Sequence, residues 1–320
     1  MKKKLGDKSD AFQWVAPQLV DYDNIKKGDM PGDVIQIHTG HIMKAEAVFP
    51  KLYQLVMDIQ ELHSNNKVVI SVHGGSGVGK SEIGALLAYY FNDLGIGTYI
   101  LSGDNYPYRI PKHNDQERLR IFRDKGLKGL VEQGAYNKER GEVLRKLQEL
   151  NLDFDPNKVK VDPWLFIYHQ EGRKGLEGYL GTVSEIDFEE INHIIAQFKN
   201  GKESILLKRM GREVTDLWYD KVDFSNIKIM VIEWTHGNNA DLIGVDIPIL
   251  LNSTPSETLE HRRLRNRDGG TDSPFTTLVL DIEQKLLFSQ APRAKIIVLK
   301  DGEIINYEQY RQIMLQEGLL

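Results

Sequence analysis

The spacing of apolar residues changes along the chain, and each change predicts an element of secondary structure. Residues 1–45 are polar with short apolar pieces, and they predict an irregular arm. A helical spacing begins after Pro50, so we expect a helix with this proline in its first turn. The β-branched run 68–72 predicts a buried strand, a helical pattern covers 83–91, and residues 98–101 predict a second strand. Strand, helix and strand in this order form a parallel crossover unit.

The same alternation continues less regularly in the rest of the chain. The region 105–225 is mixed, and within it residues 188–198 have helical spacing. Further strands are predicted at 164–168, 227–232, 247–251 and 296–299. We therefore expect an α/β fold with a mostly parallel sheet flanked by helices.

The composition of the sequence excludes several functions that an α/β fold could have. The 41 basic and 46 acidic residues give a formal net charge of -5, whereas nucleic-acid-binding proteins normally carry a strongly basic balance. The sequence has no cysteine, which excludes disulfides, thiolate metal sites and cysteine nucleophiles. The lysines at 2–4 are followed by polar residues rather than by the apolar core of a signal peptide, and no apolar window is long enough to span a membrane. We expect a cytoplasmic protein that binds neither nucleic acid nor membrane, and a homo-oligomer is compatible with the sequence.

A glycine-rich segment follows the first predicted strand and opens the next helix. It fits the pattern Gly-x-x-x-x-Gly-Lys-Ser of the Walker A motif. The main-chain N–H groups of such a turn bind phosphate together with the helix N-terminus, and glycine is needed where a Cβ would block the approach. The residues predicted to bind ATP are Gly74, Gly75, Ser76, Gly77, Val78, Gly79, Lys80 and Ser81.

Within this motif, Lys80 and Ser81 have separate roles. We expect Lys80 to reach the β- and γ-phosphates and the Ser81 hydroxyl to ligate Mg²⁺. The alternative is a flexible connector, which has no need for a Lys-Ser pair at this place. No Asn-Lys-x-Asp motif follows a later strand, which argues against a GTPase and leaves an ATPase open.

Two acidic residues follow predicted strands. Asp104 comes after the strand 98–101, and Glu233 comes after the strand 227–232. Ligands of open α/β sheets bind beyond the carboxyl ends of the strands. Phosphoryl transfer to a hydroxyl needs one carboxylate that accepts the proton and another that organises Mg²⁺. We assign these roles to Asp104 and Glu233, respectively; a turn aspartate and an ion-paired glutamate are the alternatives.

Short blocks of the sequence resemble the phosphoribulokinase/uridine kinase family of P-loop kinases. They are the loop 74–81, Ser-Gly-Asp-Asn-Tyr-Pro-Tyr-Arg at 102–109, the stretch 187–202, Glu-Trp-Thr-His-Gly at 233–237 and the arginine-rich stretch 258–268. The resemblance implies a P-loop NTP hydrolase-like kinase fold, ATP as the phosphoryl donor and Asp104 as the catalytic carboxylate. It also implies that 258–268 is a lid and that 187–202 contains the helix before a substrate hairpin.

The sequence departs from the family pattern in three places. Trp234 stands where a glycine is usual, and the lid continues into Gly269-Gly270 rather than into the usual polar stretch. The Tyr-Asp pair that uridine kinases have after the hairpin is absent, which argues against plain uridine as the acceptor.

With this resemblance, the chain is divided into two parts. Residues 1–66 form an N-terminal extension, an irregular arm plus a helix, and 67–320 form the P-loop kinase domain. Within that domain we expect a substrate-side insertion at about 105–225 and the arginine-rich lid at about 255–273.

The arginines of the lid fall on two faces of one predicted helix. Arg263 and Arg267 share a face at i, i+4 spacing, and Arg262 and Arg265 share another. We expect one pair to point at the transferring phosphoryl group, where an arginine stabilises the transition state; exposed salt bridges are the alternative. The predicted catalytic residues are Lys80, Asp104, Arg263, Arg267 and Asp268. Whether Asp104 or Asp268 is the base stays open.

Predicted substrate-binding residues lie close to Asp104 in the sequence. Arg109, Lys112 and His113 suit an acceptor that already carries phosphate or carboxylate, since a guanidinium holds such a group bidentately. Tyr106 and His236 belong to the family-like segments and complete the predicted acceptor site.

Two other basic groups have a structural alternative. For Arg118, Arg120 and Arg123 we expect a solvated helix face. Lys208, Arg209 and Arg212 could contribute to an anion site, and an ordinary surface hairpin is an equal alternative.

Three hypotheses for function follow. The first is an ATP- and Mg²⁺-dependent kinase that phosphorylates a hydroxyl of a small, anionic metabolite, with nucleosides or adenylylsulfate as alternative acceptors. The second is a nucleotide-dependent regulatory ATPase or switch in which residues 1–66 contact a partner. The third is a non-catalytic relative, against which the intact Gly79-Lys80-Ser81 and Asp104 argue.

Overall fold

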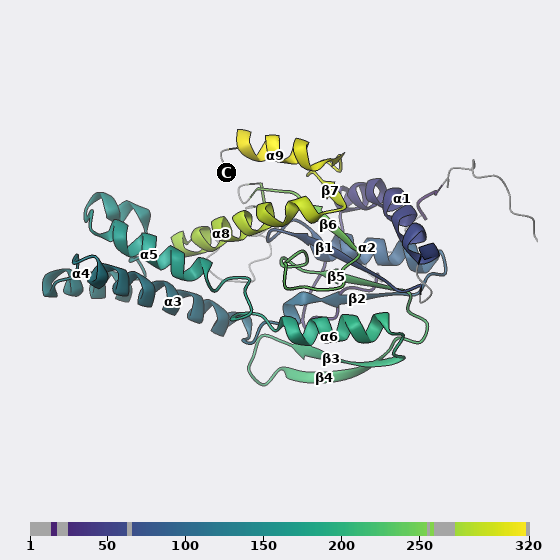
Figure 1. Ribbon diagram of the computed structural model, residues 1–320, viewed down its shortest axis with the longest axis horizontal. Coiled ribbons are helices and arrows are strands. Elements are labelled where there is room, and N and C mark those ends of the chain that lie inside the picture. Colours follow the sequence, from purple (N-terminus) through teal and green to yellow (C-terminus); the bar gives the residue numbers. More distant parts are fainter. Residues whose placement is uncertain (1–13, 18–24, 63–65, 255–256, 259–272, 318–320) are drawn as a thin grey trace, which may run out of the picture.

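The computed structural model describes residues 14–17, 25–62, 66–254, 257–258 and 273–317. Its centre is a six-stranded sheet with the strand order β2-β5-β1-β6-β7-β8 (Figure 1). Neighbouring strands are parallel except β7 and β8. The strands are β1 (Val68–Gly74), β2 (Thr98–Ser102), β5 (Ile229–Glu233), β6 (Ile247–Leu251), β7 (Ile296–Val298) and β8 (Ile304–Ile305). The predicted mostly parallel sheet is confirmed.

Helices cover both faces of the sheet because its central strands bury side chains on both sides. In β1, Ile70 belongs to one hydrophobic core and Val69 to another, as the alternation of side chains along a strand requires. The first core lies under α1 (Thr39–Leu62) and α2 (Lys80–Asp93). The second core lies under α6 (Phe188–Lys199).

Further elements extend the second face. The antiparallel hairpin of β3 (Ser204–Met210) and β4 (Leu217–Asp223) follows α6, as the resemblance implied. Near the other edge of the sheet, α8 (Pro274–Gln290) and α9 (Tyr307–Gln316) pack on β6 and β7.

Three helices project away from the sheet (Figure 1). They are α3 (Pro111–Glu132), α4 (Lys138–Glu149) and α5 (Leu165–Glu177), and we call them the helical projection. They share a small core with Phe275 at the start of α8. Since α3 follows the 3-10 turn η1 (Gly103–Asn105) after β2, the projection is attached at the carboxyl edge of the sheet. A second 3-10 turn, η2 (Pro156–Lys160), precedes α5, and a third, η3 (Ala291–Arg293), follows α8.

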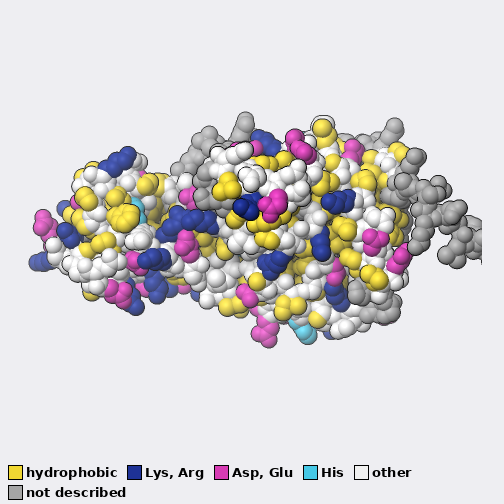
Figure 2. All heavy atoms as spheres, turned by 45° about the horizontal axis from the view of Figure 1, so that its top comes forward, with side chains coloured by type: hydrophobic (Ala, Val, Ile, Leu, Met, Phe, Trp, Pro, Cys, Tyr) yellow, Lys and Arg dark blue, Asp and Glu magenta, His cyan; other side chains and the backbone are white. Residues whose placement is uncertain are grey.

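The surface of the helical projection carries exposed apolar side chains. Val131, Leu150, Val161 and Phe166 are among them, and Figure 2 shows hydrophobic side chains gathered on this part of the molecule. On the same face, basic side chains lie beside acidic ones. No helix among the described residues is both long and apolar enough to cross a membrane.

Two expectations about secondary structure are wrong. Helix α1 begins at Thr39 and contains Pro50 in its interior, because Ala45, Val48 and Phe49 already bury the same face as the residues after the proline and this burial outweighs the hydrogen bond that proline removes. Residues 164–168 begin α5 rather than form a strand. A short apolar run fits a strand and a buried helix equally well, and periodicity alone does not separate them.

Candidate active site at the carboxyl edge of the sheet

The glycine-rich segment forms the turn between β1 and α2. Gly77 and Gly79 have φ angles of 80° and 92°, in the left-handed region that side chains other than glycine rarely adopt. Gly79 is the N-cap of α2 and supplies no side-chain capping hydrogen bond. Because glycine has no side chain, Gly79 cannot cap the first N–H groups of α2, which suits a phosphate at the helix N-terminus.

Lys80 and Ser81 point in different directions from the start of α2. Lys80 Nζ donates to the carbonyl oxygen of Gly75, 2.9 Å away, and so lies back over its own loop. Ser81 Oγ donates to Glu233 Oε2 at 2.8 Å, and both side chains are buried. This hydrogen bond links the start of α2 to the end of β5.

The strand register brings the predicted carboxylates together. Glu233 pairs with Val72 of β1 and with Ser102 of β2. Asp104 lies two residues beyond Ser102, in η1, and its side chain is exposed. Lys80, Ser81, Glu233 and Asp104 therefore lie at the ends of three adjacent strands, as predicted.

The electrostatics of Glu233 fit a cation site. Burial and then the nearby Asp104 carboxylate raise the pKa of Glu233 to about 8, so ionisation of this carboxyl is favoured when a cation binds beside it. Among the described residues, no group of three or more His, Cys, Asp or Glu is arranged to hold a metal. Mg²⁺ bound to a nucleotide needs no such group, since phosphates and water complete its octahedron around one or two protein oxygens. The Ser81 hydroxyl and the Glu233 carboxylate suit that role.

His73, directly before the loop, belongs to the core. It is fully buried, and both ring nitrogens have no hydrogen-bond partner among the described residues. Burial, followed by Lys80 and Arg293, lowers its pKa to about 3. The ring is neutral at physiological pH.

On the acceptor side, the basic residues are bonded to the protein itself. Arg109 Nη1 donates to the Tyr179 hydroxyl at 3.1 Å, and this hydroxyl donates to Asn114 Oδ1 at 3.0 Å. Asn114 Nδ2 in turn donates to Glu185 Oε1 at 2.7 Å, and Arg118 Nη2 lies 2.7 Å from the same oxygen. Arg109, which was predicted to bind an anionic acceptor, is thus hydrogen-bonded within the protein, and Arg118, which was predicted on a solvated helix face, is paired with Glu185.

The other predicted acceptor residues are not gathered into one pocket. Lys112 and His113 are exposed on the first turn of α3. Tyr106 is fully buried in the second core, and its hydroxyl has no hydrogen-bond partner among the described residues. His236 is buried against Trp234, with ring centroids 5.3 Å apart, and burial lowers its pKa to about 4.

The solvated helix face expected for the arginines of α3 is found for only one of them. Arg120 is exposed and pairs with Glu117, whereas Arg123 Nη2 lies 2.8 Å from the fully buried Asp153. The surface hairpin is likewise wrong for Lys208 and Arg209, whose exposed fractions are 8% and 6%. The spacing of residues along the sequence could not predict the partners of these side chains, because the partners belong to distant segments of the chain.

Two acidic residues of the site had no sequence signal. Glu185 accepts from Gly181 N, Asn114 and Arg118, and lies at the junction of the projection and the sheet. Glu283, on α8, lines a space of about 10 Å³ against Gly75 and Ser76 of the phosphate loop. Burial raises its pKa, opposed by Arg118 and Lys80. A single acid within an amphipathic helix is indistinguishable from a surface residue until the helix is placed.

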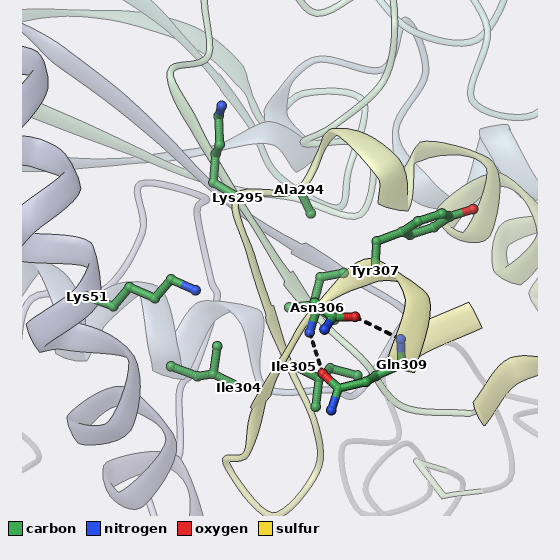
Figure 3. A pocket seen from close by; sticks show the side chains of 9 residues that line it. Lys51, Ala294, Lys295, Ile304, Ile305, Asn306, Tyr307 and Gln309 are labelled. Carbon is green, nitrogen blue, oxygen red and sulfur yellow. Dashed lines mark hydrogen bonds between the residues drawn. The ribbon is translucent and has the colours of Figure 1, made fainter. Parts of the chain in front are cut away.

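A larger hollow lies elsewhere. It has a volume of about 440 Å³ and is lined by residues that include Lys51, Lys295 and Tyr307 (Figure 3). Asn306 and Gln309 in its wall bond to each other's backbone and cap α9. Because the hollow lies at the amino end of β7, whereas the phosphate loop follows the carboxyl end of the parallel β1, it is separate from the candidate active site.

The predicted lid cannot be compared with the structure. Arg263, Arg267 and Asp268, with the rest of 259–272, lie outside the described residues. The assignment of Asp104 as the base therefore stays a prediction, with Asp268 as the alternative.

No family model matches the chain. The curated bifunctional alpha-galactosidase/sucrose kinase AgaSK from Mediterraneibacter gnavus is 40% identical to it over 259 residues, which are 81% of this chain and 23% of that protein. The chain thus spans less than a quarter of this relative's length. The relative is in part a kinase by name, and this confirms the resemblance to kinases that the short motifs indicated.

Solved structures add distant likenesses. A possible uridine kinase from Bacillus stearothermophilus has 14% identity and a TM-score of 0.39, over 77% of this chain and 98% of that one. The YGR205w protein has 9% identity and a TM-score of 0.44, over 82% of this chain and 96% of that one. Likenesses of this strength carry no argument about the site, which rests on the sheet, the loop and the carboxylates of this chain. These features define a P-loop protein.

Proposed function

We propose that the protein is an ATP-dependent kinase that transfers the γ-phosphoryl group to a hydroxyl of a small metabolite. The observation that carries this proposal is the hydrogen bond of 2.8 Å between Ser81 and Glu233, which stands beside Asp104 at the end of the neighbouring strand. A phosphate loop, a cation site and an exposed carboxylate at one edge of a parallel sheet are the parts that such a transfer needs.

Each part has a defined task in the proposed reaction. The loop amides and Lys80 bind the triphosphate, and the Ser81 hydroxyl and the Glu233 carboxylate hold Mg²⁺, which offsets the phosphate charge when bound. Asp104 accepts the proton of the acceptor hydroxyl as its oxygen bonds to the γ-phosphorus. The bond between that phosphorus and the β–γ bridging oxygen breaks, so ADP leaves with the bridging oxygen.

For the acceptor, we favour a neutral sugar over the anionic metabolite first expected. Arg109 lies 3.7 Å from Glu117 and Arg118 lies 2.7 Å from Glu185, so each guanidinium would have to leave an acidic partner to bind an anion. The relative's name includes a sucrose kinase, which supports a sugar hydroxyl as the group phosphorylated.

A coupled assay of ADP release tests the proposal. Neutral sugars, including sucrose and its monosaccharides, are compared with sugar phosphates, glycerate, nucleosides and adenylylsulfate at equal concentration. We expect release to be stimulated by a neutral sugar and to require Mg²⁺. Stimulation only by an anionic compound would overturn the sugar assignment and leave the kinase intact.

The regulatory ATPase is the outcome to be excluded. Slow ATP hydrolysis that no acceptor stimulates would support it and contradict the kinase. Detection of a phosphorylated acceptor by mass spectrometry separates true transfer from hydrolysis.

A further inference from the structure

The segment before α1, residues 25–38, reaches the candidate active site. We propose that its Asp29 is a positioning residue: it holds the turn that carries Asp104 and ties that turn to the β3–β4 hairpin. The inference rests on the proposed function, in which Asp104 is the base.

Asp29 is bound from both sides of the turn. Its Oδ1 accepts from Ser102 N at 2.7 Å and from Asn105 Nδ2 at 3.0 Å. These two residues lie on either side of Gly103-Asp104. Because the contacts fix a main-chain N–H before the base and a side chain after it, they limit how far the turn can move.

The other oxygen of Asp29 reaches the hairpin. Oδ2 accepts from the Tyr99 hydroxyl at 2.8 Å and from Arg209 Nη1 at 2.9 Å. Arg209 Nη2 also donates to the Tyr99 hydroxyl at 3.0 Å. Four donors therefore surround one carboxylate whose side chain is 10% exposed, an arrangement in which charge-assisted hydrogen bonds select a single geometry.

A second connection makes the coupling between turn and hairpin direct. Asn105 Oδ1 accepts from Met210 N, at the end of β3, at 3.0 Å. Asn105 thus bonds to Asp29 with its nitrogen and to the hairpin with its oxygen. Loss of the Asp29 carboxylate removes one partner of Asn105 and leaves Arg209 without its buried partner.

The neighbouring residue shows how closely this segment approaches the site. A Cβ on Gly28 would stand 3.0 Å from Glu233 Oε1. The segment therefore packs against the cation-site carboxylate and at the same time holds the turn of the base. Residues 25–38 are in this sense part of the catalytic machinery, although the phosphate-loop motif begins only at Gly74.

The expected effect falls on the chemical step. Asp104 is exposed, and the Asp29 network holds the residues on either side of Gly103-Asp104, whereas the Lys208 contact to the Pro107 carbonyl oxygen holds the chain three residues further on. Lys80 and the loop amides lie outside the network. A displacement of about 1 Å in a reacting group costs on the order of a hundredfold in rate. Weakening the Asp29 contacts should therefore lower kcat and leave the KM for ATP unchanged.

The helical projection offers a matched control. Asp153 is also buried, binds Arg123 at 2.8 Å and accepts from the Tyr168 hydroxyl at 2.8 Å. It thus has the same three residue types in the same contacts, at a place that carries no proposed catalytic group. Asp29→Asn and Asp153→Asn remove the same charge from similar surroundings.

The experiment compares steady-state kinetics and thermal unfolding of the two variants in the full chain. We expect both melting temperatures to fall, but only Asp29→Asn to lower kcat, by about tenfold to a hundredfold, with the KM for ATP unchanged. A kcat for Asp29→Asn equal to that of Asp153→Asn would overturn the positioning role.

A milder variant keeps the test decisive if Asp29→Asn does not fold. Tyr99→Phe removes one donor to Asp29 and leaves the Arg209 ion pair, and we expect a smaller loss of kcat in the same direction. An unchanged kcat in this variant would count against the proposal. If Asp104→Asn itself turns over normally, the proposed function has the wrong base; if Asp104→Asn is inactive and both Asp29→Asn and Tyr99→Phe are normal, only the positioning role is wrong.

Discussion

The two sides of the candidate active site are built in different ways. The nucleotide side is one continuous stretch, residues 74–81, between β1 and α2. The acceptor side is assembled from the segment 25–38, η1, the start of α3, Glu185 and the hairpin. A phosphate needs main-chain N–H groups in one turn, which local sequence supplies, whereas a substrate hydroxyl needs side chains that only packing can bring together.

The two sides also differ in whether their polar groups already have hydrogen-bond partners within the protein. The N-cap of α2 is Gly79, which has no side chain to cap the first N–H groups of the helix. Arg109, Arg118 and Arg209 on the acceptor side are bonded within the protein. In the proposed function, the nucleotide side thus leaves main-chain donors for the phosphates, whereas the arginines of the acceptor side make hydrogen bonds and ion pairs within the protein.

Lys80→Ala should have the largest effect, because the proposed function assigns binding of the triphosphate to this lysine of the phosphate loop, together with the loop amides. We expect turnover to fall by about a thousandfold and the rise in melting temperature on adding ATP to disappear. Thermal shift with and without ATP and Mg²⁺ measures the second effect.

Lys51→Ala is the control for that experiment. Lys51 is an exposed lysine in the wall of the separate hollow, and its removal should leave turnover and the ATP-induced shift unchanged. If Lys51→Ala rather than Lys80→Ala abolished the shift, the nucleotide would bind in the hollow.

Asp104→Asn tests the boundary between the two sides. The amide keeps the size of the side chain but cannot accept the proton, so we expect turnover to fall by about a hundredfold to ten-thousandfold. The ATP-induced shift should stay, because Asp104 is not part of the phosphate loop. Near-normal turnover would move the base elsewhere, with Asp268 as the next residue to replace.

Glu233→Gln tests the cation site through the pH dependence of protein stability. The pKa of Glu233 in the folded protein is about 8, above the ordinary value of 4.5. In the absence of Mg²⁺, the free energy of unfolding should therefore fall as the pH rises from about 4.5 to about 8, because the unfolded chain loses this proton first. The glutamine variant lacks this decrease. We expect it to be about as stable as the parent near pH 5 and more stable at pH 9, by up to about 5 kcal/mol, since each unit of the pKa difference corresponds to about 1.4 kcal/mol.

Urea unfolding of the parent and the variant across this pH range, without Mg²⁺ or nucleotide, measures the difference. A gap that does not change with pH would contradict the raised pKa of Glu233. Addition of Mg²⁺ and nucleotide should reverse the order at high pH, since only the parent has a carboxylate to offer the cation.

Arg109→Ala should have the smallest effect. If the acceptor is neutral and Arg109 only donates a hydrogen bond to Tyr179, the KM of the variant for the acceptor should rise by no more than about threefold. A guanidinium that bound an anionic acceptor would be worth about 1.5–3 kcal/mol, and its loss would raise that KM by roughly ten- to a hundredfold. Acceptor titrations at saturating ATP separate the two outcomes.

How much the sequence could predict follows the same division. The strand at 68–72, the loop and α2 were predicted because each depends on a pattern within a few residues, and Asp104 and Glu233 because strand ends in a parallel sheet share one edge. A strand was predicted at 164–168, where the helix 165–177 begins, and Pro50 was predicted in the first turn of a helix that in fact begins at Thr39. In both places burial against other segments of the chain determines the structure.

The partners of the charged side chains could not be predicted at all. Asp29 and Arg209 are 180 residues apart, and Asn114 and Glu185 are 71 apart. No spacing rule links such positions, since the distance between them is set by how the sheet, the projection and the hairpin pack. Arg118 and Arg123 were for this reason expected on a solvated helix face, and Arg209 either in an anion site or on a surface hairpin, and all three are found in ion pairs.

The amino-acid sequence by itself determined the phosphate loop, the parallel sheet that presents it and the two carboxylates at the strand ends, because hydrogen bonds along the backbone and hydrophobic periodicity act over short stretches. Only the tertiary structure decided that Asp29 and Gly28 reach this edge and that the arginines near Asp104 are neutralised. Those outcomes depend on long-range burial, in which a charge is tolerated only where a distant segment supplies its partner.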